Sequence, residues 1–248
     1  ATGDTITFTA PHTTDGSNPI RTYLDTLAVT APVNSDGDVT LSVSLVTTDN
    51  DGSTKTDSYN HTVTVQAVAD TPSVSASNIS STEDTADIPL VILPVRSSDQ
   101  DGSETLSVLV SLPGGGSPLL SLTPKSVSTG SDALTVSGPV VVGGHNVYSV
   151  TGTHGGSAIG TVTITDNGNG TYLVQGPTVS DPATSTSAAT AIDAVLGAGV
   201  LTLQTQAQWS GSLTGSNGIR VDAISTEAAS GGQLAANSYG GADNTSKT

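Results

Sequence analysis

Two carboxylates separated by one residue and followed by glycine occur twice in this 248-residue chain. One motif has Asp99 and Asp101 with Glu104 close behind, and a shorter relative has Asp49 and Asp51. Ca²⁺ takes six to eight hard oxygen ligands, and the Asp-x-Asp-Gly spacing brings two carboxylates to one tight turn. The sequence therefore predicts calcium ligands at Asp99, Asp101 and Glu104, and a second, separate site at Asp49 and Asp51.

Further acidic residues extend this prediction. Asp70 lies at an expected joint between domains, where it would add a ligand to the Asp99 site, and Glu83 and Asp84 form another acidic pair. An alternative stays open, because Asp and Gly also dominate turns that hold no ion. The motif is not an EF-hand, since the 12-residue loop closed by glutamate is missing.

The overall charge favours cations as partners. Twenty-two acidic residues stand against six basic ones, which gives a formal charge of −16. Nucleic acid is an unsuitable partner, because phosphate binding needs clustered Lys and Arg. The chain has no cysteine, so disulfides and thiolate metal sites are excluded. No apolar run is long enough for a membrane helix, so no membrane insertion is expected, and no secretion signal is visible.

Catalytic chemistry finds little support in the sequence, and we expect no enzyme. The four histidines, at positions 12, 61, 145 and 154, have no partner at a spacing that indicates a triad, and no Gly-x-Ser-x-Gly elbow occurs. Paired carboxylates for glycoside hydrolysis stay an open alternative. A sugar-cleaving cleft usually brings aromatic platforms, however, and Trp209 is the only tryptophan.

Alternating apolar residues predict an all-β fold. The patterns Leu41, Val43, Leu45 and Leu106, Val108, Val110 are typical of half-buried strands. Residues 167–170, Asn-Gly-Asn-Gly, predict a hairpin turn, and the Ala-rich segment 187–196 predicts one short helix that ends at a glycine. Strands are predicted at 73–79, 88–96, 104–112, 133–141, 146–152, 159–165, 171–175, 200–208 and 219–226.

The chain is expected to hold two related domains. Pro72 follows an apparent joint near Asp70, which divides the chain into residues 1–70 and 71–248. Segments 20–56 and 192–248 show similar patterns with drifting spacing, as loop insertions between repeats produce. Residues 1–70 are then the C-terminal part of a sandwich. If the second unit follows this plan, its closing strand, equivalent to residues 59–65, lies beyond Thr248.

These features together resemble the tandem repeats of giant bacterial adhesins secreted by type I systems, the RTX adhesins with cadherin-like and immunoglobulin-like modules. The resemblance rests on residues 68–72, on Thr82–Thr85 with Ile88–Leu90, and on the acidic motif running from Asp99 to Val108. It implies tandem β-sandwiches, the second one enlarged, which calcium stiffens into an extender on the bacterial cell surface. The implied partners are neighbouring repeats of the same polypeptide or fibre.

Residues 113–190 depart from a simple extender of about 100 residues. They could be an elaborated sandwich or a binding module for glycan, peptide or another surface, inserted in an extender region. A binding module is expected to have a concave site lined by residues of 113–190, with aromatic residues such as Tyr148, Tyr172 or Trp209. Extender, binding module and accessory domain of an enzyme all remain open at this point.

Overall fold

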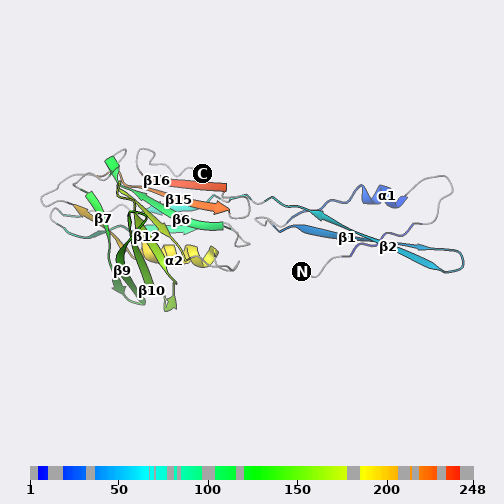
Figure 1. Cartoon of the computed structure of the whole chain (residues 1–248), viewed down its shortest axis with the longest axis horizontal. Coiled ribbons are helices and arrows are strands. Elements are labelled where there is room, and N and C mark those ends of the chain that lie inside the picture. The colour runs from blue at the N-terminus through cyan, green and yellow to red at the C-terminus, as the bar shows by residue number, and fades with distance from the viewer. Residues whose placement is uncertain are drawn as a thin grey trace. The chain divides into compact units, whose positions relative to one another are not determined.

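The computed structural model describes residues 5–10, 19–31, 37–66, 68–69, 71–76, 81–82, 85–96, 104–115, 120–177, 185–205, 213, 218–227 and 233–240. The chain divides into two compact units, Ala1–Val33 and Asn34–Thr248. The expected joint near Asp70 lies within the second unit and stays a prediction. The fold class is as predicted: the protein is an all-β sandwich, with antiparallel sheets and a short helix (Figure 1).

The first unit contains a short helix, α1 (Pro19–Leu24). The amide of Asp25 donates to the carbonyl of Arg21 over 2.9 Å, and the Thr26 hydroxyl donates to the carbonyl of Tyr23 over 2.7 Å. The rings of Phe8 and Tyr23 stack with their centres 5.5 Å apart. This aromatic pair ties the described N-terminal segment to the helix.

A long hairpin opens the described part of the second unit. Strands β1 (Val39–Thr48) and β2 (Thr54–Val63) pair with each other along their whole length and form a two-stranded sheet of their own. The alternation at Leu41, Val43 and Leu45 correctly predicted a strand here. The half-buried face that the same pattern predicted is not found, because the structure leaves these three side chains 37–47% exposed.

The sandwich that follows is built on a nine-stranded sheet. Its strands run in the spatial order β16-β15-β6-β13-β12-β10-β9-β8, with β11 paired to β10, and every pairing is antiparallel. Their bounds are β6 (Glu104–Ser111), β8 (Val127–Thr129), β9 (Asp132–Val142), β10 (His145–His154), β11 (Ser157–Ala158), β12 (Val162–Asp166), β13 (Thr171–Gln175), β15 (Arg220–Glu227) and β16 (Gln233–Gly240).

Two smaller sheets and a helix complete the sandwich. The three-stranded sheet has the order β4-β14-β7, and β3 pairs with β5. Helix α2 packs against β5, β6, β12 and β13 (Figure 1). The bounds are β3 (Ser73–Ala76), β4 (Ile88–Pro89), β5 (Ile92–Arg96), the single 3₁₀ turn η1 (Pro113–Gly115), β7 (Leu120–Pro124), α2 (Ser185–Gly197) and β14 (Leu201–Thr205).

A single apolar core joins these layers. Val108, Val150 and Ile164 of the large sheet are fully buried, as are Ile192 of α2 and Leu201 of β14. Small and branched aliphatic side chains supply this core, as expected for a chain with one Phe and one Trp. In helix α2 the apolar residues that the sequence pattern singled out, at positions 188, 192, 195 and 196, are all buried, and Ala189, Ala191 and Ala194 are buried as well.

The hairpin turn at 167–170 is confirmed. The Asn167 amide donates to the Thr171 carbonyl over 3.0 Å, and Gly168 and Gly170 take φ values of 74° and 76° that favour glycine.

No helix in the described part of the chain is long and apolar enough to span a membrane.

One expectation needs correction. The strand next to 219–226 was expected beyond Thr248, but β16 occupies that position and pairs with β15 from Arg220↔Gly240 to Glu227↔Gln233. The alignment of segment 20–56 with segment 192–248, which placed this strand beyond Thr248, therefore does not hold. Small residues such as Ala235, Ala236 and Ser238 gave β16 no recognisable alternation. Strands β7 and β8 were also missed.

Candidate functional site

The Asp49–Gly52 motif forms the turn between β1 and β2. The Asp49 amide donates to the Ser53 carbonyl over 2.8 Å, and the Gly52 amide donates to the Asp49 carbonyl over 2.9 Å. Gly52 has a φ of 84°, a conformation that side chains disfavour. The motif therefore closes the hairpin by ordinary turn chemistry.

Both carboxylates of this motif accept hydrogen bonds from the turn itself. Asp49 Oδ1 accepts the Asn50 amide and Asp51 Oδ1 accepts the Ser53 amide, each over 2.8 Å. Hydrogen bonds from the Ser53 side chain and backbone lower the pKa of Asp51 below its ordinary value. Two carboxylates alone do not provide six oxygens for Ca²⁺. Among the described residues, no group of three or more acidic or histidine side chains is placed to hold a metal ion.

The other predicted calcium ligands lie mostly outside the described residues. Asp70, Glu83, Asp84, Asp99 and Asp101 all belong to this category, so their prediction stands as it was made. Glu104 is the first residue of β6.

The sheet register adds an acidic position that sequence reasoning missed. Glu104 of β6 is the register partner of Glu227 of β15, and Glu227 is in turn the partner of Gln233 in β16. Only the strand pairing brings these two residues to neighbouring positions, since 123 positions separate them in the sequence.

Two of the three aromatic residues proposed for a ligand site, Tyr172 and Tyr148, lie in the described part of the structure. Tyr172 is buried in β13, where its hydroxyl accepts the Leu122 amide over 3.2 Å and burial raises its pKa above the usual 10.0. Tyr148 packs half-buried against the same core. Tyr172 is thus a core residue and not an exposed platform, and Trp209 lies outside the described residues.

A polar network joins the ends of the three-stranded sheet. Asp87, which precedes β4 and has a φ of 62°, forms an ion pair with Lys125 and accepts a hydrogen bond from the Gln204 amide. Both contacts lower the pKa of the Asp87 carboxyl, and the hydrogen bond from Lys125 is the larger cause. Gln204 also donates to Thr202 Oγ1 over 3.2 Å. Because Lys125 and Asp87 are both partly exposed, we assign the network a structural role.

A second ion pair closes two neighbouring turns. His154 Nδ1 lies 3.0 Å from Asp132 Oδ2, while Asp132 Oδ1 accepts the Gly155 amide over 3.0 Å. The Gly155 hydrogen bond is the main cause of the lowered pKa of Asp132, with a smaller part from His154. The pair joins β9 to the end of β10, and the Ser131 hydroxyl lies 3.5 Å from Asp132 Oδ1, so this serine contacts the carboxylate and not the imidazole.

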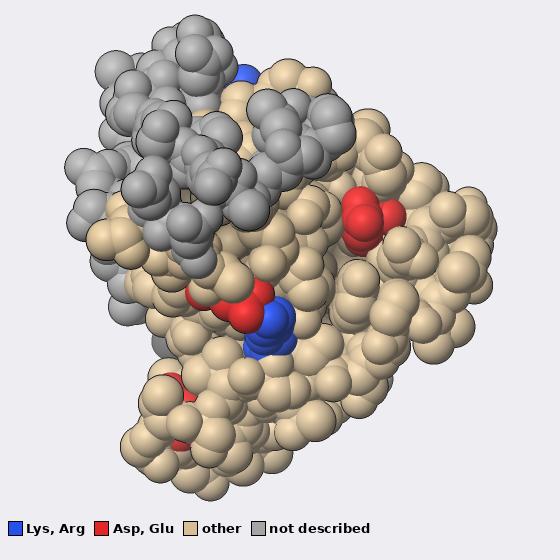
Figure 2. All heavy atoms as spheres, turned by 90° about the vertical axis from the view of Figure 1, so that its left-hand side faces the viewer, with Lys and Arg blue, Asp and Glu red and all other residues tan. Residues whose placement is uncertain are grey.

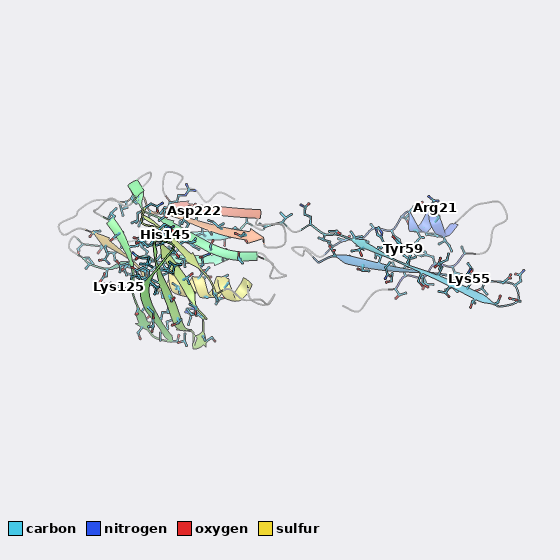
Figure 3. All side chains as sticks on the ribbon, viewed as in Figure 1. Arg21, Lys55, Tyr59, Lys125, His145 and Asp222 are labelled. Carbon is cyan, nitrogen blue, oxygen red and sulfur yellow. The ribbon has the colours of Figure 1, made fainter. Side chains whose placement is uncertain are left out.

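The described surface at the end of the sandwich carries few charges. Figure 2 shows it mainly uncharged, with a basic and an acidic patch side by side in one place. Figure 3 shows Lys125, His145 and Asp222 on the sandwich, and Tyr59 and Lys55 on β2. The tip of hairpin β9–β10 adds three exposed valines, Val140, Val141 and Val142.

In comparisons with protein-family models, with curated proteins and with solved structures, no match to this chain was found. The fold, an antiparallel all-β sandwich with a helix in its core, and the geometry of the residues above are therefore the basis for assigning a function.

Proposed function

We propose that this chain is a non-catalytic extender segment of a bacterial cell-surface adhesin, in which sandwich repeats follow one another along an extracellular fibre. The observation that carries the proposal is that the first strand of the sandwich, β3, contacts its last strands, β15 and β16. Val74 of β3 is buried in this joint. Because first and last strands are neighbours, a pull on the chain loads their packing directly.

Single-molecule force spectroscopy on the whole chain tests this role. With handles at both termini, the sandwich should unfold in one cooperative event that releases about 600 Å, since about 170 residues each contribute about 3.6 Å. Val74→Ala should lower the unfolding force. Val150→Ala, which truncates another buried valine in β10, serves as the control.

The control separates mechanical from thermodynamic effects. Both variants lose buried methyl groups and lose stability in urea. Only Val74 lies at the joint between first and last strands, so only Val74→Ala should lower the force beyond its effect on stability. Equal effects of the two changes on the unfolding force, or unfolding without a force peak, would show that the packing of β3 against β15 and β16 does not resist the pull.

Calcium belongs to this proposal as a stiffening ion. Asp99, Asp101 and Glu104 are the proposed ligands, with Asp70 from the linker and Glu227 added by the strand register. The donor set consists of hard oxygens, which suits Ca²⁺. Asp49 and Asp51 are weaker candidates, because each already accepts a turn amide.

A ligand-binding module for glycan, peptide or another surface is the second candidate. The exposed valines at the tip of hairpin β9–β10 favour it, since 58–69% of each side chain is open to solvent. Binding of the chain to an array of glycans and peptides tests this role. A hit that Val141→Ser abolishes and that Val46→Ser in hairpin β1–β2 leaves intact would support it over a purely mechanical segment.

A further inference from the structure

The two faces of hairpin β1–β2 differ sharply in chemistry. Leu41 pairs with His61, Val43 with Tyr59 and Leu45 with Asp57, so these side chains share one face. With Val39 and Val63 they form what we call the apolar face, which the pair Thr47 and Lys55 continues toward the turn. Apart from Val46, the opposite face consists of Ser, Thr and Asn: Thr40, Ser42, Ser44, Thr48, Thr54, Thr56, Ser58, Asn60 and Thr62.

The apolar face needs a cover. Leu41, Val43 and Leu45 are 37%, 41% and 47% exposed, and Tyr59 is 68% exposed. A two-stranded hairpin is at best marginally stable in water, and antiparallel sheets normally bury their apolar side. The separation of apolar and hydroxyl side chains, which Val46 breaks on one face and Thr47 and Lys55 on the other, indicates that one face packs and the other meets water.

The pattern of the apolar face is symmetric about the Val43–Tyr59 pair. Leu41 and Leu45 lie two residues to either side of Val43, while Asp57 and His61 lie two residues to either side of Tyr59. A two-fold axis that lies between two stacked hairpins and crosses the strands at this pair reverses each strand direction. Leu45 then meets the second copy's Leu41, and Asp57 meets the second copy's His61.

We propose that a second copy of this chain covers the apolar face, with two β1–β2 hairpins stacked about this axis. The charge pattern selects the arrangement, because an imidazole N–H donates to a carboxylate in both Asp57–His61 contacts. A two-fold axis along the strands would place Asp57 on Leu45 instead and would bury an uncompensated carboxylate near the middle of the face. The axis across the strands places a charge on an apolar residue only at the turn end of the face, where the exposed Lys55 meets the second copy's Val63. The stacked geometry agrees with aligned packing of two sheets.

This inference goes beyond the proposed function. Extension along a fibre requires no contact between copies, whereas stacked hairpins join two chains side by side at this segment. Failure of one proposal therefore leaves the other standing.

Sedimentation velocity over a range of protein concentrations tests the dimer directly. Two chains of net charge −16 repel each other, so the measurement is made at about 0.15 M salt, where repulsion between charges more than about 8 Å apart is largely screened. Wild type should pass from monomer to dimer with rising concentration. Val43→Thr should raise the dissociation constant by about tenfold or more, because the change occurs once in each copy.

Val46→Thr is the matched control, since Val46 is a 56% exposed valine on the opposite face of the same strand. The control should leave association unchanged. Equal effects of Val43→Thr and Val46→Thr would overturn the proposal. So would a chain that stays monomeric at all concentrations, which would assign the cover of the apolar face to another segment or partner.

A charge exchange tests the register. Asp57→His alone and His61→Asp alone each place like residues opposite one another and should weaken the dimer. The double variant Asp57→His/His61→Asp restores both contacts and should restore association to near the wild-type value. A double variant as weak as the single variants would rule out this axis, even if a dimer forms.

Discussion

The hydroxyl of Tyr172 on β13 accepts a hydrogen bond from the backbone amide of Leu122 on β7, over 3.2 Å in the buried interior. Strand β13 belongs to the nine-stranded sheet and β7 to the three-stranded sheet. This bond therefore links the two sheets across the core, and it occupies an amide that no water reaches.

Replacing Tyr172 by Phe should lower the free energy of unfolding by about 1–3 kcal/mol, because the Leu122 amide loses its acceptor while it stays buried. Urea denaturation followed by tryptophan fluorescence or circular dichroism measures this change. Tyr148→Phe is the control, since among the described residues the Tyr148 hydroxyl forms no hydrogen bond, and it should cost less than about 0.5 kcal/mol. A Tyr172→Phe protein as stable as Tyr148→Phe would show that the bond contributes nothing.

Gly152 should tolerate no side chain. Its φ is 143°, and a Cβ atom there would lie 1.9 Å from the Ala133 carbonyl oxygen on β9. Gly152→Ala should therefore separate β9 from β10 and destabilise the sandwich by more than about 3 kcal/mol. Thermal melting checks this expectation. Gly197→Ala, at the end of α2 in open space, should be neutral or slightly stabilising.

Acid should weaken the turns that Asp132 and Asp87 hold. Hydrogen bonds lower the pKa of both carboxyls in the folded protein below the ordinary value of 3.8. The folded state then binds fewer protons than the unfolded chain, so this stabilisation is present above about pH 4 and is lost as the pH falls through the folded pKa. Urea denaturation at pH 6 and pH 3 should show the loss.

The same experiment on variants identifies the source. Asp132→Asn should reduce the pH dependence between pH 6 and pH 3. His154→Ala should retain most of it, because the Gly155 amide is the larger cause of the lowered pKa. If His154→Ala abolishes the dependence as fully as Asp132→Asn, the ion pair and not the amide controls this carboxyl.

Calcium should raise the melting temperature of the protein, and EDTA should reverse the rise, because bound Ca²⁺ compensates clustered carboxylates only in the folded state. Asp101→Asn and Glu227→Gln should each reduce the calcium-dependent shift, whereas Asp57→Asn should not. Isothermal titration calorimetry gives the number of ions. A melting temperature that calcium and EDTA leave unchanged would refute the ion site.

Local pattern alone predicted much of the secondary structure. The period-two alternation over Leu106, Val108 and Val110 identified β6, and the Ala-rich run ending at Gly197 identified α2. These signals are local because a strand or helix that packs on one face must repeat its apolar residues with the period of the backbone. The Asn-Gly turn before β13 is local for the same reason, since it depends on positive φ.

What the sequence by itself determined is thus the all-β class, an apolar core made mainly of aliphatic side chains, the helix and the strongest strands. The tertiary structure decided which strands are neighbours: β6 lies between β13 and β15, and Glu104 opposes Glu227. It also decided that Tyr172 and Val174 of β13 are buried, whereas Leu41, Val43 and Leu45 of β1 are exposed. Both strands carry these apolar residues at every second position in the sequence. The physical reason is that alternation marks the face of a strand that prefers to be covered, whereas burial depends on whether a distant segment supplies the cover.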